Sequence, residues 1–171
     1  MTDMLVKLYA LGDDEAAVAG VLLRRALAPE RRPVLAGVES RFGGGWAGEC
    51  EAAFARTPTG CLLALRERAV LGFAVWDVTA RGFFGPIGIE ASQRGGGIGA
   101  ALLLAGLRAM RAEGYAYAII GGVGPADFFA RTVGAVPIPD STPGIYAGLV
   151  KADAGPKAVG AILPGNLGND T

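Results

Sequence analysis

The sequence predicts a single α/β domain, and three observations support this prediction. Strand-like and helical patterns of apolar residues alternate along residues 4–150. A glycine cluster at residues 95–99 separates a strand-like run from a long helical run. The length of 171 residues and the hydrophobic share of 51% suffice for one buried core. We therefore expect one domain over residues 1–150, followed by a tail over residues 151–171 that is mobile or packs on a partner.

The amino-terminal third is expected to hold one strand and two helical regions. Residues 4–10 form a strand-like run, and Asp13-Asp14 then caps a helix that runs to about residue 28. Pro33 starts a second helical segment that reaches about residue 42. Three glycines interrupt this segment before residues 46–55 resume the helical pattern. The expected result is a helical arm that is broken near its middle.

A hairpin and a further strand are expected next. Residues 60–66 and 69–78 are apolar runs separated by a turn at Glu67-Arg68, which predicts an antiparallel pair. The following strand, over residues 82–90, contains Pro86 and three glycines. Because proline lacks the amide needed for a ladder hydrogen bond, we expect this strand to bulge or to leave its neighbour.

The second half of the domain is expected to begin with a buried helix. Residues 98–113 are nearly all apolar in the first ten positions, as in a helix packed firmly on a sheet, and Gly114 supplies its end. The remaining expected elements are a strand over residues 116–122, a short helix over residues 125–131, and closing strands over residues 136–138 and 144–150.

The stretch from Gln93 to Gly99 predicts a phosphate-binding site. The first amides of a helix have no intrahelical partner and lie at the positive end of its dipole, and glycines let an anion approach them closely. A nucleotide-hydrolysing loop is excluded, because Ala100-Ala101 follow Gly99 in place of a lysine and a hydroxyl residue. A dinucleotide-binding loop is disfavoured, because the next strand ends without an acidic residue. A glycine-rich turn that holds no ligand is the remaining alternative.

The motif Arg94-x-x-Gly97-x-Gly99 resembles the Arg/Gln-x-x-Gly-x-Gly/Ala motif of the GNAT (GCN5-related) N-acetyltransferases, and the order of elements over residues 4–150 is similar as well. The resemblance implies a mixed, mostly antiparallel central sheet flanked by helices, with a splayed V between the two central strands. It also implies that acetyl-coenzyme A (acetyl-CoA) binds in that V without a metal. The cofactor-binding residues it implies are Ile87, Gly88, Ile89, Arg94, Gly95, Gly96, Gly97, Ile98, Gly99, Phe128 and Phe129.

The resemblance implies transfer of an acetyl group from acetyl-CoA to a primary amine of a small molecule by direct attack. Many members of the family protonate the leaving thiolate from a tyrosine in the short helix, but the matching pair here is Phe128-Phe129. Tyr146 is the alternative proton donor, unless it is a core or rim residue. Glu90 and Asp77 are the nearby carboxylates that could act as base, with a solvated surface acid as the alternative role of either. A non-catalytic acyl-CoA-binding module is the alternative function.

The acceptor pocket of the resembling fold is shaped by the loop between the first two helices and by the last strands. The substrate-binding residues implied here are Trp46, Phe84 and Ser141, with a buried anchor as the alternative role of Trp46. A lysine-like amine is mostly protonated at neutral pH, and the usual bases are missing. We therefore expect an acceptor amine of low pKa, such as an amino acid α-amine or an amino sugar, deprotonated through water.

The composition excludes several classes of function. The chain has no histidine, which excludes serine and cysteine hydrolases that depend on one. Sixteen basic and sixteen acidic residues cancel, so neither nucleic acid nor a membrane surface is an expected partner. Cys50 and Cys61 are expected to be reduced core thiols. The sequence shows neither a leader pattern nor a long apolar run, so the expected location is the cytoplasm. A homodimer is left open.

Overall fold

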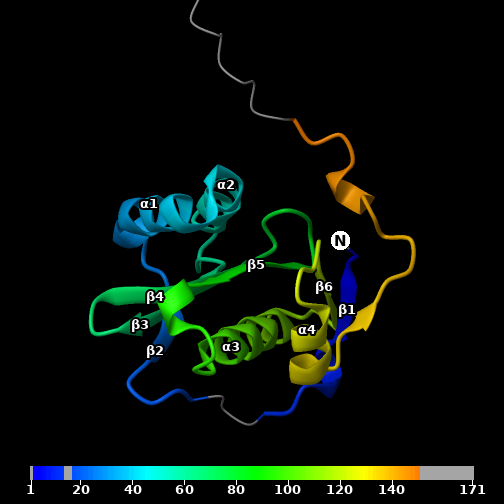
Figure 1. The fold of residues 1–171 in the computed structure, drawn as a ribbon, viewed down its shortest axis with the longest axis horizontal. Coiled ribbons are helices and arrows are strands. Elements are labelled where there is room, and N and C mark those ends of the chain that lie inside the picture. The colour runs from blue at the N-terminus through cyan, green and yellow to red at the C-terminus, as the bar shows by residue number, and fades with distance from the viewer. Residues whose placement is uncertain (1, 14–16, 151–171) are drawn as a thin grey trace, which may run out of the picture.

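The computed structural model describes residues 2–13 and 17–150, which form a seven-stranded sheet with helices on both faces (Figure 1). The strand order is β2-β3-β4-β5-β6-β1-β7. Every neighbouring pair is antiparallel except β5 and β6, which are parallel. The predicted mixed, mostly antiparallel sheet is therefore confirmed. The predicted tail over residues 151–171 lies outside the described residues.

Strands and helices follow one another along the chain in the order β1, β2, α1, α2, β3, β4, β5, α3, β6, α4, β7. The strands are β1 (Met4–Lys7), β2 (Leu22–Arg25), β3 (Cys61–Arg66), β4 (Ala69–Trp76), β5 (Phe83–Ile89), β6 (Tyr117–Ile120) and β7 (Val136–Pro137). The helices are α1 (Arg31–Phe42), α2 (Gly44–Ala53), α3 (Ile98–Ala112) and α4 (Ala126–Val133), with short 3-10 turns η1 (Leu8–Ala10), η2 (Ala28–Glu30), η3 (Ala91–Gln93) and η4 (Gly144–Tyr146). In Figure 1, α1 and α2 lie above the sheet, whereas α3 and α4 lie below it.

The two helical layers cover two apolar clusters, one on each face of the sheet. In β3, Cys61, Leu63 and Leu65 pack with α1 and α2, whereas Leu62 and Ala64 pack with α3. Successive side chains of a strand point to opposite faces, so a strand covered on both sides needs apolar residues at every position. This is why β3 is a continuous apolar run in the sequence.

The two cysteines lie in the cluster beneath α1 and α2. Cys50 on α2 and Cys61 on β3 are both buried and free, which confirms the prediction of reduced core thiols. The neighbouring Cys50 sulfur and burial raise the pKa of the Cys61 thiol, so this thiol stays protonated at neutral pH.

The central strands part, as the sequence predicted. The parallel pairing of β5 with β6 consists of Phe83–Ile119 and Phe84–Ile120, and it stops there. On its other edge β5 remains paired with β4, with a register shift where Gly85 and Pro86 oppose a single residue. Pro86 has no amide to donate, and Gly85 adopts a φ of +119°, which favours glycine. The bulge and the departure expected for this strand are therefore both present.

The predicted first helix is wrong in its second half. Leu22–Arg25 is an edge strand, β2, whose four residues pair with Leu62–Leu65 of β3. The apolar spacing there suits a helix. The edge of β3, however, has free backbone donors and acceptors, and residues 22–25 form hydrogen bonds with them as a strand. Tertiary pairing overrides local preference in such short segments. Residues 14–16 of the predicted helix lie outside the described residues.

The first and last predicted strands also need correction. The first strand ends at Lys7, and the chain continues as the 3-10 turn η1. The last one, expected over residues 144–150, is the 3-10 turn η4 followed by irregular chain. Gly144 there has a φ of +56°, which is outside the extended region of a strand. The sheet instead ends at β7, a strand of two residues beside β1.

Replacing Gly106 of α3 by alanine is expected to destabilise the fold. A Cβ at this position would lie 2.5 Å from the ring of Phe84, which is only 1% exposed. The overlap is expected to lower the free energy of unfolding by about 1–3 kcal/mol. Gly48→Ala on α2 is the control, because a Cβ there meets nothing within 4 Å and alanine is the better helix former by up to about 1 kcal/mol. Equal urea midpoints for the two variants would contradict the prediction.

Candidate functional site

A cavity of about 1060 Å³ lies along the gap between β5 and β6. Its walls come from β5, the loop before α3, the first turns of α3 and α4, the segment after β6, α2 and η4. We call it the V cavity. Its two ends differ in chemistry: one is lined by glycines and Arg94, and the other by aromatic rings, Glu49 and Tyr146.

The glycine-rich end exposes the first amides of α3. Gly97 is the N-cap residue with a φ of +81°, and no side chain caps the helix. The first helical backbone bond runs from the Ala101 amide to the Gly97 carbonyl at 3.0 Å, so the three amides before Ala101 have no helical partner. Arg94 is exposed and lines the cavity here, with its Nε 3.3 Å from the Ile89 carbonyl oxygen. This end presents amide donors and one guanidinium, a combination that suits an anion.

The edge of β5 that faces β6 is unpaired beyond Phe84. The Glu90 amide donates to the Leu71 carbonyl of β4 at 2.9 Å. Because backbone groups alternate between the two edges of a strand, the polar groups of Ile89 and Ile87 point away from β4 and into the gap. The V cavity therefore has a row of backbone donors and acceptors along one wall.

Nine of the eleven cofactor-binding residues expected from the sequence line the V cavity. They are Ile87, Gly88, Ile89, Arg94, Gly95, Gly97, Gly99, Phe128 and Phe129. The other two lie elsewhere: Gly96 is exposed beside the cavity wall, and Ile98 is buried in the core under α3. The structure thus brings the predicted set together, and its binding role stays a prediction.

The opposite end of the V cavity is aromatic and carries one carboxylate. Trp46 on α2 stacks on Phe42 with 5.2 Å between ring centroids, and it remains 38% exposed. Glu49 follows one helical turn later on the same face of α2, and the Thr79 hydroxyl donates to its Oε1. Phe84, also expected at the acceptor site, is a buried part of the wall.

Tyr146 lies at the point where β5 and β6 separate. It belongs to η4, not to the strand expected there, and its hydroxyl lies so close to Gly121 that a Cβ on Gly121 would overlap it. Burial raises the pKa of Tyr146 above its ordinary value, and the negative charges of Glu49 and Asp3 add to the effect. The phenol therefore stays protonated at neutral pH and is available as a hydrogen-bond donor.

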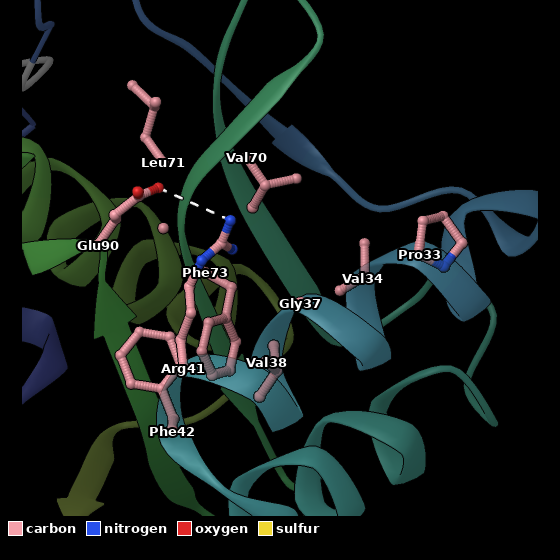
Figure 2. Close-up of a pocket in the computed structure, with 11 residues that line it drawn as sticks. Pro33, Val34, Gly37, Val38, Arg41, Phe42, Val70, Leu71, Phe73 and Glu90 are labelled. Carbon is pink, nitrogen blue, oxygen red and sulfur yellow. Dashed lines mark ion pairs between the residues drawn. The ribbon is translucent and has the colours of Figure 1, made fainter.

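The other carboxylates expected near the site lie outside the V cavity. Glu90 faces Arg41 of α1 at 3.7 Å in a separate, small hollow between α1 and β4 (Figure 2). Asp77 accepts hydrogen bonds from the Tyr115 hydroxyl and the Gly82 amide, both at 2.6 Å. The geometry therefore gives neither carboxylate a place beside the aromatic end of the cavity.

Ser141 has a different surrounding from the one expected for a substrate-binding residue. Its hydroxyl accepts from the Asp3 amide at 2.8 Å and donates to the Ile138 carbonyl at 2.8 Å. These bonds join the chain after β7 to the start of β1. Ser141 does not line the V cavity.

Sequence reasoning missed Glu49 and Thr79. The signal for Glu49 was the spacing from Trp46, since residues three apart on a helix share one face. If Trp46 faces an acceptor pocket, Glu49 faces it too. No sequence pattern pointed to Thr79. It lies in the loop after β4, and only the tertiary structure brings it within hydrogen-bond distance of Glu49.

Comparison with solved structures identifies the fold. The chain matches the GCN5-related glucosamine N-acetyltransferase region of a fungal multi-domain GH3 β-N-acetylglucosaminidase with a TM-score of 0.65 and 12% identity, over 80% of this chain and 19% of that chain. It matches a GCN5-related N-acetyltransferase from Sphaerobacter thermophilus with a TM-score of 0.58 and 19% identity, over 80% and 48%. The match to one from Kribbella flavida has a TM-score of 0.54 and 21% identity, over 80% and 53%.

The chain therefore has the GCN5-related N-acetyltransferase fold, as the resemblance implied. It spans about half or less of the length of these three solved chains. No family model and no curated protein matches the sequence. Within residues 2–13 and 17–150, no helix is long and apolar enough to cross a membrane. In the same described part of the chain, no three potential metal-ligating side chains come together.

Replacing Gly121 by alanine is expected to displace Tyr146. The added Cβ would overlap the hydroxyl and also approach Phe83 to 3.0 Å, and Phe83 is the more deeply buried of the two side chains. Moving the phenol toward water removes the burial that raises its pKa, so Tyr146 should ionise at lower pH than in the parent protein. NMR titration of labelled tyrosine rings measures this, with Gly124→Ala as a control whose Cβ meets nothing within 4 Å. An unchanged Tyr146 titration in Gly121→Ala would contradict the placement.

Proposed function

We propose that this chain is an N-acetyltransferase that transfers an acetyl group from acetyl-CoA to a primary amine of a small molecule by direct attack. The observation that carries the proposal is the gap between β5 and β6, which runs from the bare amino terminus of α3 to the hydroxyl of the half-buried Tyr146. The fold shared with GCN5-related N-acetyltransferases supports it.

The residues around the gap fit acetyl-CoA. The free amides of α3 and the Arg94 guanidinium suit a pyrophosphate, because both donate to anionic oxygens. The unpaired edge at Ile87 and Ile89 suits the amide-containing pantetheine arm, which can pair with a strand edge as a peptide does. When bound, acetyl-CoA supplies an acetyl group activated as a thioester.

Two groups of this chain then serve acyl transfer. A backbone amide of Ile87 or Ile89, turned into the gap, donates to the oxygen on which negative charge develops. Tyr146 donates to the departing sulfur from the point where the strands separate. Tyr146 thus acts as the proton donor to the leaving thiolate. The resemblance places that donor at the position of Phe129, which has no hydroxyl. Acetylation therefore has donors at both reacting atoms without a histidine.

Arg94→Ala is expected to weaken acetyl-CoA binding. Removing one charged hydrogen-bonding group from a phosphate costs about 1.5–3 kcal/mol, or roughly 10- to 150-fold in Kd. Isothermal titration calorimetry measures the change, and Arg68→Ala is the matched control because Arg68 lies in the hairpin turn between β3 and β4, away from the V cavity. Parent and Arg94→Ala proteins that bind equally well, or a parent that does not bind, would contradict the site.

A thiol-release assay with a panel of primary amines separates transfer from binding alone. Release of coenzyme A that depends on the amine is the expected result, together with the acetylated amine in the product mixture. Tight binding without release for any amine would favour the alternative of a non-catalytic acyl-CoA-binding module.

A further inference from the structure

The two charged groups of the V cavity lie at opposite ends. Of the described residues that line it, Glu49 and Arg94 alone carry a charge. Arg94 stands beside the bare amino terminus of α3, where the proposed pyrophosphate binds. Glu49 comes from α2 and lies at the aromatic end, where it is bonded to Thr79 and its charge acts on Tyr146. Among the residues that line this end, an acceptor therefore meets the negative charge of Glu49 and no positive charge.

A hydrogen bond orients the Glu49 carboxylate, but no ion pair offsets its charge among the described residues. The Thr79 hydroxyl donates to Oε1, which leaves Oε2 to accept from another donor. Within the part of the chain that the structure describes, no arginine or lysine forms an ion pair with Glu49. The half-buried carboxylate differs in this from Glu90, which has Arg41 opposite it. A cationic ligand is the partner that this arrangement lacks.

The surroundings of Glu49 also define the body of that ligand. Trp46 stands one helical turn before Glu49 and is stacked against Phe42, so the rings form a fixed aromatic wall beside the carboxylate. Such a wall favours an apolar or aromatic body and also attracts a cation through its π face. A carboxylate on the acceptor has no cation to pair with at this end and would be repelled by Glu49.

We propose that Glu49 binds the ammonium group of the acceptor and accepts its proton, and that the acceptors are monocationic primary amines with an apolar or aromatic body and no carboxylate. This role rests on the acetyltransferase function proposed above. It replaces the expectation of a low-pKa amine deprotonated through water, because a carboxylate in the site can remove the proton. Amino acids are then poor acceptors.

Acetyl transfer to the ammonium balances in protons and electrons with Glu49, Tyr146, the acceptor and acetyl-CoA. The ammonium gives one proton to the Glu49 carboxylate, directly or through one water, and Glu49 later releases it to solvent. The neutral nitrogen forms the bond to the thioester carbonyl carbon, the carbon–sulfur bond breaks, and its electron pair goes to sulfur. Tyr146 gives its proton to the sulfur and regains the second proton lost by the nitrogen. The net products are the amide, coenzyme A and one proton.

The matched pair 2-phenylethylamine and phenylalanine tests the specificity. The two differ only in the carboxylate, and the amine is expected to have a kcat/KM at least tenfold higher. Glucosamine is the third acceptor in the assay, and it should also fall below 2-phenylethylamine because it lacks an apolar body. A preference for phenylalanine or for glucosamine would overturn the assignment of acceptor class.

Glu49→Gln tests the role of the carboxylate, with Glu39→Gln on α1, outside the V cavity, as the matched control. Glu49→Gln is expected to lower kcat/KM for 2-phenylethylamine about 100-fold at neutral pH, and Glu39→Gln to leave it unchanged. Because the free amine needs no base, the defect of Glu49→Gln should shrink as the pH rises toward the pKa of the amine. A merely structural role would leave the defect independent of pH, and that outcome, or unchanged activity, would overturn the proposal.

Calorimetry with acetyl-CoA on the same preparations distinguishes failure of the Glu49 role from failure of the acetyltransferase function. Binding by the parent and by Glu49→Gln with equal affinity is expected, because Glu49 lies at the far end from Arg94. If the parent binds acetyl-CoA and Glu49→Gln still acetylates amines normally, only the role of Glu49 fails. If the parent binds no acetyl-CoA, the acetyltransferase function fails and the role of Glu49 fails with it.

Discussion

The separation of β5 from β6 is the constraint on which the site depends. On one side, β5 stays paired with β4 before and after the bulge at Gly85 and Pro86, where Pro86 has no amide to donate. On the other, the chain after β6 is tied to the start of β1: the Gly122 amide donates to the Asp3 carboxylate at 2.8 Å, and the Val123 amide donates to the Thr2 carbonyl at 3.0 Å. Each strand is thus held by its outer neighbour. The edge of β5 beyond Phe84 is left unpaired with β6.

The glycine-rich end of the V cavity, where we propose that phosphate binds, derives its rigidity from the core. The apolar face of α3 is buried against β3, β4 and β5, and residues such as Leu102 and Leu107 are inaccessible to solvent. The helix cannot shift without opening this core, so its bare amino terminus keeps one position at the mouth of the gap. The glycines before it leave the amides uncovered. The apolar face of α3 thus contributes to stability, and its amino terminus supplies the amides of the proposed anion site.

The aromatic end of the V cavity is assembled differently, from segments far apart in the sequence. Glu49 belongs to the helical layer above the sheet in Figure 1, Thr79 to the loop after β4, and Tyr146 to η4 near the end of the described chain. Only Trp46 and Glu49 are linked by local spacing. The orientation of Glu49 therefore depends on the packing of α2 on the sheet and on the turn after β4.

Local pattern by itself determined the hairpin of β3 and β4, the broken arm of α1 and α2, the buried helix α3, and the glycine motif with most of its neighbours. Each of these depends on interactions within a few residues: a turn, a proline, an apolar stripe or an uncapped helix end. Tertiary structure decided the rest. Leu22–Arg25 became a strand because β3 offered an open edge, and Gly144–Tyr146 became a turn beside β6. Glu90 faces Arg41, whereas Glu49 faces the cavity. The environment of a charged side chain depends on elements that the fold brings from elsewhere, and spacing along the chain does not encode it.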